Sequence, residues 1–227
     1  FLFYTTLEVD ALICIALEAD LLSAIITNRS LISLDLSENE LKDSGVKHLC
    51  EGLRHPDCVL QELGLEDCDL LSCGEDLRSV IITNRSLIKL DLSKNYLEDS
   101  VVKSLCEGLM HPDCVLQELG LHDCLVTPSC CEHLYSVIIT NRSLIVLDLS
   151  MNDLDAGVKR LCEGLRHPGC VLQNLWWYWG VVGAVEMQNV VLGLQGQWGH
   201  RRWYWGLRGS RGAEGGIRGC GAVGHRG

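Results

Sequence analysis

The chain has 227 residues, of which 47% are hydrophobic and 22% are charged, and its formal net charge is -11 at pH 7. This length and apolar content are enough to bury a sizeable core, so disorder along the whole chain is excluded. The negative charge argues against a nucleic-acid-binding protein, because phosphate recognition relies on lysine and arginine.

Residues 1–30 are predicted to be a truncated leading repeat. Four of them have the spacing of one apolar helix face, with no recognisable strand before them: Leu17, Leu21, Ala24 and Ile25. The apolar run 12–17 is too short to cross a bilayer and lacks the basic residues that open a secretory signal. The thirteen cysteines are odd in number and mostly periodic, which favours reduced thiols. We therefore expect a cytoplasmic protein without membrane contact.

From residue 27 onward the chain repeats itself. The phrase TNRSLIxLDLSxN begins at Thr27, Thr83 and Thr140, and each copy is followed by a version of LCEGLxHPxCVLQ. A shorter pattern, LxxLxLxx(N/C), divides each of these periods again. It begins at spacings of 27 to 29 residues, at Leu31, Leu60, Leu87, Leu116 and Leu144. Residues 31–175 are therefore predicted to hold about five full leucine-rich repeats and the start of a sixth.

Each short repeat is predicted to contain one strand and one helix. Leu34, Asp35 and Leu36 alternate with the period of a strand, with the leucines inward. A candidate N-cap, Asp43, precedes an apolar helical stripe formed by Val46, Leu49, Cys50 and Leu53. The corresponding stripe of the second repeat type is Cys73, Leu77, Val80 and Ile81. Proline cannot continue a helix, so the first helix type should end at His55-Pro56, His111-Pro112 and His167-Pro168.

Stacked repeats of this kind predict an α/β fold, a leucine-rich-repeat solenoid shaped as a horseshoe arc. The parallel sheet should lie inside the bend and the helices outside. The ninth position of the short pattern is predicted to be structural, with its side chain bonded to the backbone of the turn between repeats. These turn positions are Asn39, Cys68, Asn95, Cys124 and Asn152.

The residues beside the inward leucines should form the concave surface and bind a protein partner. They are Ser33, Asp35, Glu62, Glu66, Lys89, Asp91, Glu118, His122 and Asp148. Most of them are acidic, which predicts a partner with a basic surface. A merely solvated acidic face is the alternative, because acidity alone keeps a protein soluble.

Two further kinds of site can be weighed in the repeats. Cys50, His55 and Cys58 recur in all three periods and could bind zinc, but their places favour cysteine as a small buried hydrophobe. No metal, no cofactor and no catalytic residue is predicted, since no pairing of nucleophile and base distinguishes one copy from another. The glycosylation sequons at Asn28, Asn84 and Asn141 are interpreted as helix exits.

At residue 176 the composition changes. All six tryptophans fall within residues 176–227, together with most of the glycines, and Gly180 stands where Asn or Cys is due. The segment offers neither inward leucines nor a helix stripe at the required spacing. We therefore predict a non-repeat tail rich in Gly, Trp and Arg that is disordered and does not pack on the solenoid.

The LDLSxN strands and LCEGLxHPxC phrases resemble the C-terminal repeat region of an NLRP protein (NACHT, leucine-rich repeat and pyrin domains), and more distantly ribonuclease inhibitor. The resemblance covers residues 17–175. It implies a protein-interaction module with a part in sensing and autoinhibition in innate-immune inflammasome proteins, where the repeats would contact the NACHT module. The alternative is a free-standing inhibitor that binds a basic enzyme. The chain has no GxxxxGK(S/T) phosphate loop, so nucleotide hydrolysis is not carried over from the family.

Overall fold

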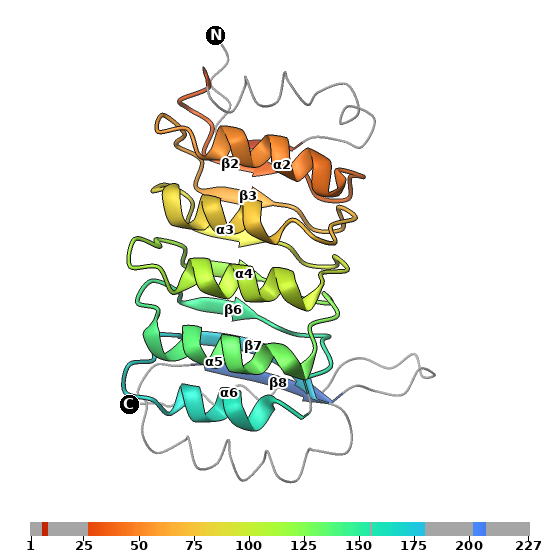
Figure 1. Ribbon diagram of the computed structural model, residues 1–227, viewed down its shortest axis with the longest axis vertical. Coiled ribbons are helices and arrows are strands. Elements are labelled where there is room, and N and C mark those ends of the chain that lie inside the picture. Colours follow the sequence, from red (N-terminus) through yellow and green to blue (C-terminus); the bar gives the residue numbers. More distant parts are fainter. Residues whose placement is uncertain (1–5, 9–26, 155, 180–201, 208–227) are drawn as a thin grey trace.

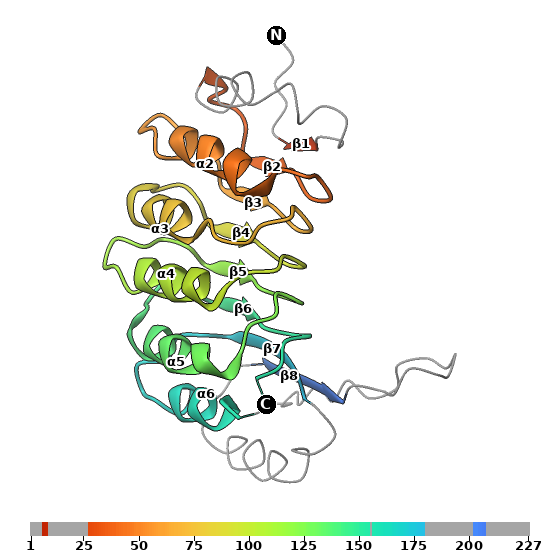
Figure 2. The same ribbon diagram turned by 45° about the vertical axis from the view of Figure 1, so that its right-hand side comes forward.

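The computed structural model describes residues 6–8, 27–154, 156–179 and 202–207. They form a stack of strands and helices, with the sheet on one side and the helices on the other (Figures 1 and 2). The strands are β1 (Thr6–Glu8), β2 (Ser33–Asp35), β3 (Glu62–Gly64), β4 (Lys89–Asp91), β5 (Glu118–Gly120), β6 (Val146–Asp148), β7 (Asn174–Trp179) and β8 (Arg202–Leu207). The helices are α2 (Lys42–Leu53), α3 (Gly74–Thr83), α4 (Asp99–Leu109), the short 3-10 helix η2 (Pro128–Cys130), α5 (Cys131–Thr140) and α6 (Val158–Leu165).

The strands form one parallel sheet whose order follows the chain from β1 to β8. Neighbouring strands pair so that each central leucine stands beside the next, as Leu34 does with Leu63 and Leu63 with Leu90. Parallel strands need a crossover, and from β2 to β7 each one includes a helix on the same side of the sheet. The predicted α/β leucine-rich-repeat solenoid is confirmed.

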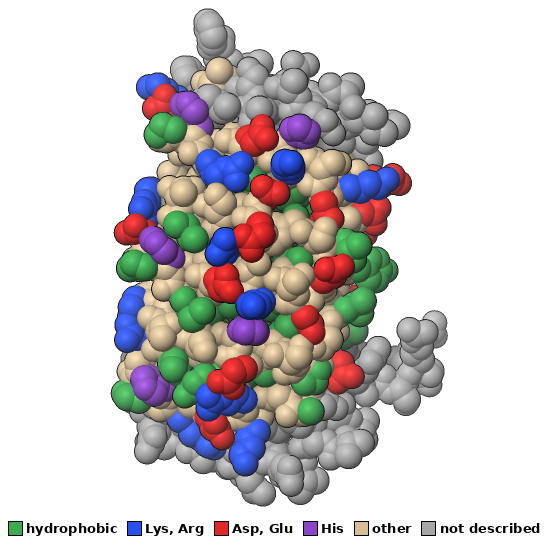
Figure 3. All heavy atoms as spheres, viewed as in Figure 1, with side chains coloured by type: hydrophobic (Ala, Val, Ile, Leu, Met, Phe, Trp, Pro, Cys, Tyr) green, Lys and Arg blue, Asp and Glu red, His purple; other side chains and the backbone are tan. Residues whose placement is uncertain are grey.

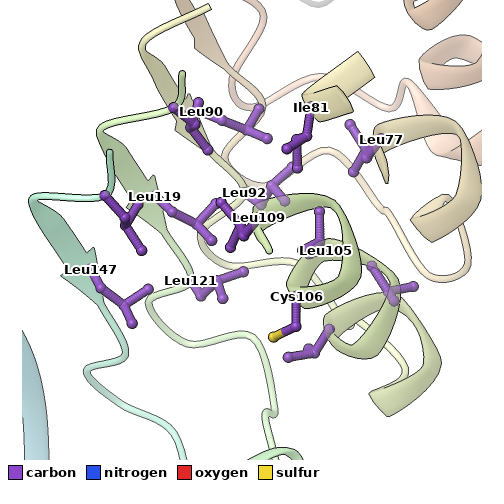
Figure 4. Close-up of a cluster of buried hydrophobic side chains, with 14 of the residues drawn as sticks. Leu77, Ile81, Leu90, Leu92, Leu105, Cys106, Leu109, Leu119, Leu121 and Leu147 are labelled. Atoms are coloured by element: carbon purple, nitrogen blue, oxygen red, sulfur yellow. The ribbon is translucent and has the colours of Figure 1, made fainter. Parts of the chain in front are cut away.

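The core lies between the sheet and the helix layer. The strand leucines Leu90 and Leu92 meet Ile81 and Leu105 from the helices, as Figure 4 shows. Each of these side chains is at most 4% exposed, and the predicted helix stripes are buried in the same way. Burying one such side chain contributes roughly 1.5 to 3 kcal/mol. The predicted inward direction of the leucines is therefore confirmed.

The predicted N-cap at Asp43 is wrong. Helix α2 begins at Lys42, and its cap residue makes no side-chain hydrogen bond to it. The Asp43 carboxylate instead accepts hydrogen bonds from the backbone amides of Leu71 and Ser72, each at 3.0 Å, in the loop of the next repeat. Those amides precede α3 and have no helical partner, so a carboxylate one repeat away satisfies them. One period later Asp99 also bonds the next repeat, where its carboxylate accepts from the Thr127 hydroxyl and the Cys130 thiol.

The predicted helix ends are confirmed. Helices α2, α4 and α6 end at Leu53, Leu109 and Leu165, two residues before each histidine–proline pair begins. The backbone amide of Cys58 then donates to the carbonyl of His55 at 3.0 Å and closes the turn that follows the helix. The chain thereby reverses towards the next strand.

Both ends of the sheet extend beyond the predicted repeats. Strand β1 pairs with β2, so a strand does precede the leading helical stripe, although the stripe itself lies outside the described residues. Strand β7 runs on to Trp179 and pairs with β8 over six residues, so these parts of the tail do pack on the solenoid. Aromatic residues favour strands, and the edge of β7 that faces away from β6 offers the backbone groups with which β8 pairs. The predictions for 180–201 and 208–227 lie outside the described residues.

Candidate functional site: the exposed face of the sheet

The exposed side of the sheet, here called the sheet face, consists of two rows of side chains beside the buried leucines. The first row is Ser33, Glu62, Lys89, Glu118, Val146 and Asn174, each paired in register with the next. The second row is Asp35, Gly64, Asp91, Gly120, Asp148 and Trp176. Lys89 thus stands between two glutamates, and every second member of the second row up to Asp148 is an aspartate.

The structure brings all nine predicted binding residues to this face. Seven of them lie in the two rows, and Glu66 and His122 lie two residues beyond the ends of β3 and β5. None of the nine is buried, whereas the leucines between them are. The face therefore offers a partner the side chains that the alternation of the strands predicts.

The three aspartates of the second row are held by local turns. Asp35, Asp91 and Asp148 each accept a hydrogen bond from the backbone amide of the serine two residues later, at 2.9 to 3.0 Å. A carboxylate that bonds its own chain in this way forms an Asx turn. The LDLS phrase therefore fixes the direction of each carboxylate before any partner arrives.

Two glycines that sequence reasoning missed leave room for these carboxylates. A Cβ atom added at Gly64 would lie 2.5 Å from Oδ1 of Asp35, and one added at Gly120 would collide with Asp91 in the same way. A side chain at either glycine would therefore displace the carboxylate of the neighbouring repeat from the position that its turn gives it. The alternation of LDLS with ELGL along the sequence is the signal that could have revealed it.

Most carboxylates of the sheet face form no ion pair with a cationic side chain among the residues that the structure describes. Lys94 Nζ lies 2.6 Å from Glu66 Oε1, and this hydrogen bond raises the pKa of Lys94. His122 Nδ1 lies 2.8 Å from Ser150 Oγ, and that hydroxyl donates to Asp148. The other five carboxylates of the predicted set form no ion pair with any residue in the described part of the chain: Asp35, Glu62, Asp91, Glu118 and Asp148. Their charges add up to a negative potential over the face.

The five predicted turn positions form a buried ladder behind the sheet face. The Asn95 amide donates to the carbonyls of Leu65 and Leu92 at 2.7 and 2.8 Å, and its oxygen accepts from the amides of Cys68 and Leu70. Asn152 repeats this arrangement one period later. The Cys68 thiol donates across repeats to the Leu36 carbonyl at 3.1 Å. The Asn95 side chain thus bonds the preceding repeat through both its nitrogen and its oxygen, whereas the Cys68 thiol bonds it through its sulfur.

The sequons at Asn84 and Asn141 stand at helix exits, as predicted. Each residue is the C-cap of its helix and is at most 6% exposed. The side-chain nitrogen of Asn84 donates to the Leu53 carbonyl at 2.7 Å, and that of Asn141 donates to Leu109 at 2.6 Å. Glycosylation would modify this same nitrogen, so a glycan at Asn84 or Asn141 is incompatible with this fold.

The zinc hypothesis finds no support in the placement of its residues. Cys50 lies fully buried in the core, whereas His55 is exposed and its Nδ1 accepts a hydrogen bond from the Asp57 amide. Burial raises the pKa of the Cys162 thiol to about 11, so its metal-binding thiolate form is scarce near neutral pH. Within the described ranges, no group of three or more His, Cys, Asp or Glu residues is arranged to hold a metal.

Comparison with known proteins identifies the same repeats. The family model described as "Leucine Rich repeat" matches residues 27–50 and 140–162. Mouse NACHT, LRR and PYD domains-containing protein 12 is 51% identical to the chain over 158 residues. The human protein of that name is 49% identical, and human NACHT, LRR and PYD domains-containing protein 3 is 48% identical. Each alignment covers 69% of this chain.

The repeats of this chain are leucine-rich repeats of the NLRP family. The chain spans 15% of the length of these mouse and human NLRP relatives. A solved structure described as a TLR13–ssRNA13 complex aligns over 70% of this chain and 26% of its own, with a TM-score of 0.32 and 18% identity. None of the helices that the structure describes is both long and apolar enough to span a membrane.

Proposed function

We propose that the chain is a protein-interaction module whose sheet face binds a partner with a basic surface. The observation that carries this proposal is the set of five carboxylates that form no ion pair within the described part of the chain, three of them fixed by their own turns. A surface of one sign raises the rate of encounter with an oppositely charged protein, and preset side chains lose little entropy on binding. The module is not proposed as an enzyme, because its buried thiols are poor nucleophiles.

The NLRP relatives give this interaction a setting. By their names they carry NACHT and PYD domains beside the repeats. We propose that the repeats serve as a sensing and autoinhibitory region of a cytoplasmic innate-immune protein that takes part in inflammasomes. In a longer relative the sheet face would then contact either the NACHT module or the partner that replaces it.

The test is capture from cell extract by immobilised chain, followed by identification of the bound proteins. Lysine in place of Asp35, Asp91 and Asp148 should abolish most capture, since it reverses the sign of the second row. Matched control variants carry lysine at Glu51, Glu107 and Glu163, which are exposed at equivalent places on the helices.

Three outcomes are decisive. Loss of capture in the sheet-face variant alone, with unchanged thermal melting, supports the proposal. Equal capture by both variants would move the binding surface away from the sheet. Potent inhibition of pancreatic ribonuclease, a basic enzyme, would instead favour the free-standing inhibitor.

A further inference from the structure

Large apolar side chains are exposed along one edge of the solenoid, where the chain leaves each strand towards the next helix. Leu71, Tyr96 and Leu125 are 48%, 64% and 57% exposed and lie in three successive loops of this kind. We call these three residues the apolar rim. Figure 3 shows hydrophobic side chains gathered with acidic ones along the right-hand edge of the molecule.

The backbone holds the three loops of the rim side by side. The amide of Glu98 donates to the carbonyl of Leu71 at 3.1 Å, and the amide of Lys94 donates to the carbonyl of His122 at 2.7 Å. Adjacent strands are about 4.8 Å apart, and Tyr96 and Leu125 occupy equivalent positions of neighbouring repeats, so these two residues lie close together along the edge. One bulky side chain of a partner can contact two of them together.

The fold does not require apolar residues here. Tyr96 and Leu125 each follow the buried turn position of their repeat, where the other repeats carry Glu40, Asp69 and Asp153. Leu125 also has a φ of 58°, and Asp69 has a φ of 56° at the equivalent place. The left-handed region suits aspartate or asparagine and is unfavourable for leucine. Leu125 therefore adds both backbone strain and exposed apolar surface.

Charge surrounds the rim and links it to the sheet face. Asp69 is exposed beside Tyr96, since the amides on both sides of Asp69 donate to the Asn95 side chain. Asp153 follows Asn152, which in turn receives the amides on both sides of Leu125. An apolar centre within an acidic border is complementary to an apolar side chain flanked by lysine or arginine.

We propose that the apolar rim binds one aromatic or aliphatic side chain, flanked by Lys or Arg, in the same basic partner that occupies the sheet face. This inference rests on the proposed function and adds the feature that would select one basic protein over another. The sheet face would attract basic surfaces in general, and the rim would discriminate among them by their apolar residue.

The probes are two short synthetic peptides that share their Lys and Arg flanks and differ only in a central Trp or Ser. The full chain should bind the Trp peptide about tenfold more tightly, a preference worth about 1.4 kcal/mol. The double variant Tyr96→Ser and Leu125→Asn should lose this preference without changing net charge, and its melting temperature should not fall. Met110→Gln, which removes an exposed apolar residue elsewhere, should keep the preference.

The outcomes separate the rim from the sheet face. Equal affinity of the native chain for both peptides would overturn the proposed role of the rim. A preference for the Trp peptide that survives in the double variant would overturn it as well. Binding of the Ser peptide that is unaffected by lysine at Asp35, Asp91 and Asp148 would overturn the proposed function. Absence of binding by either peptide would overturn both. Concentration-dependent dimers that disappear in the double variant would make a second copy of this chain the occupant.

Discussion

The helix face and the sheet face of this solenoid both carry many charged side chains, but they arrange them in opposite ways. On the helix face, arginines lie between acidic residues of neighbouring repeats: Arg78 contacts Glu75 and Glu107, and Arg160 contacts Glu132 and Glu163. Figure 3 shows this mixture of basic and acidic groups. On the sheet face most carboxylates have no such partner in the described structure.

This difference shows how one repeat pattern can serve two purposes. The ion pairs of the helix face connect neighbouring repeats, and their opposite charges largely cancel. The carboxylates of the sheet face keep negative charges that no neighbouring cation of the described structure cancels. Like charges on adjacent strands would repel one another. Gly64 and Gly120 stand between the aspartates and so double the spacing of these charges, which reduces the repulsion. This repulsion does not stabilise the fold, and the basic partner that we propose would offset it.

The largest expected effect tests whether the two faces share one core. Leu92→Ala on the strand side and Leu105→Ala on the helix side should each lower the free energy of unfolding by roughly 2 to 5 kcal/mol, because both side chains are buried. Chemical denaturation would measure this loss. An unchanged transition for either variant would mean that its assigned inward direction is mistaken.

The buried ladder should show the next largest effect. Asn95→Ala leaves the Cys68 and Leu70 amides without an acceptor and should cost roughly 1 to 3 kcal/mol. Cys68→Ala removes one bond across repeats and should cost less than Asn95→Ala. Equilibrium denaturation of both variants gives the comparison, and a reversed order would refute the unequal roles of asparagine and cysteine.

The contact of Asp99 with the next repeat should make stability depend on acid. Burial acts to raise the pKa of Asp99, but hydrogen bonds from Ser129, Cys130 and Thr127 outweigh it and lower the pKa below its ordinary 3.8. The ionised form therefore stabilises the fold above pH 3.8, and this contribution is lost as pH falls through the lower, folded-state pKa. Asp99→Asn should differ most from the native chain near neutral pH and least in acid. A pH-independent difference in denaturation would contradict this account.

The smallest effect is expected on the helix face itself. Arg160 stacks 3.4 Å over the centre of the Tyr135 ring and forms an ion pair with Glu132. The side chains of Arg160 and Glu132 are both exposed to solvent. Solvent screens such pairs, so Arg160→Ala should shift the thermal midpoint less than any variant above. It should also leave partner capture unchanged. A large loss of capture would place the binding site on the helices.

Much of the fold could be predicted because it depends on periods that each repeat carries alone. The alternation of Leu34 and Leu36 gives the inward direction, and His55-Pro56 gives the helix end, without reference to any other repeat. What could not be predicted depends on neighbours. Asp43 looked like the cap of its own helix, and only the structure shows that it serves the loop at Ser72.

The same reason accounts for what was missed at the candidate site. The strand alternation was enough to predict Asp35 and Asp91 at the site, but the close approach of Gly64 to the Asp35 carboxylate appears only when two strands are in register. The aromatic strand β7 lacks the leucine pattern, so its pairing beyond Leu175 could not be read from the repeat. Its Trp176 continues the row that contains Asp148.

Carboxyl footprinting of the chain with its captured partner tests the central claim most directly. A water-soluble carbodiimide labels accessible carboxylates, and mass spectrometry compares labelling in the free and bound states. The account predicts that Asp35, Asp91 and Asp148 become protected on binding, whereas Glu51, Glu107 and Glu163 on the helices keep their labelling. Protection of the helix carboxylates with unchanged labelling of the sheet face would contradict it.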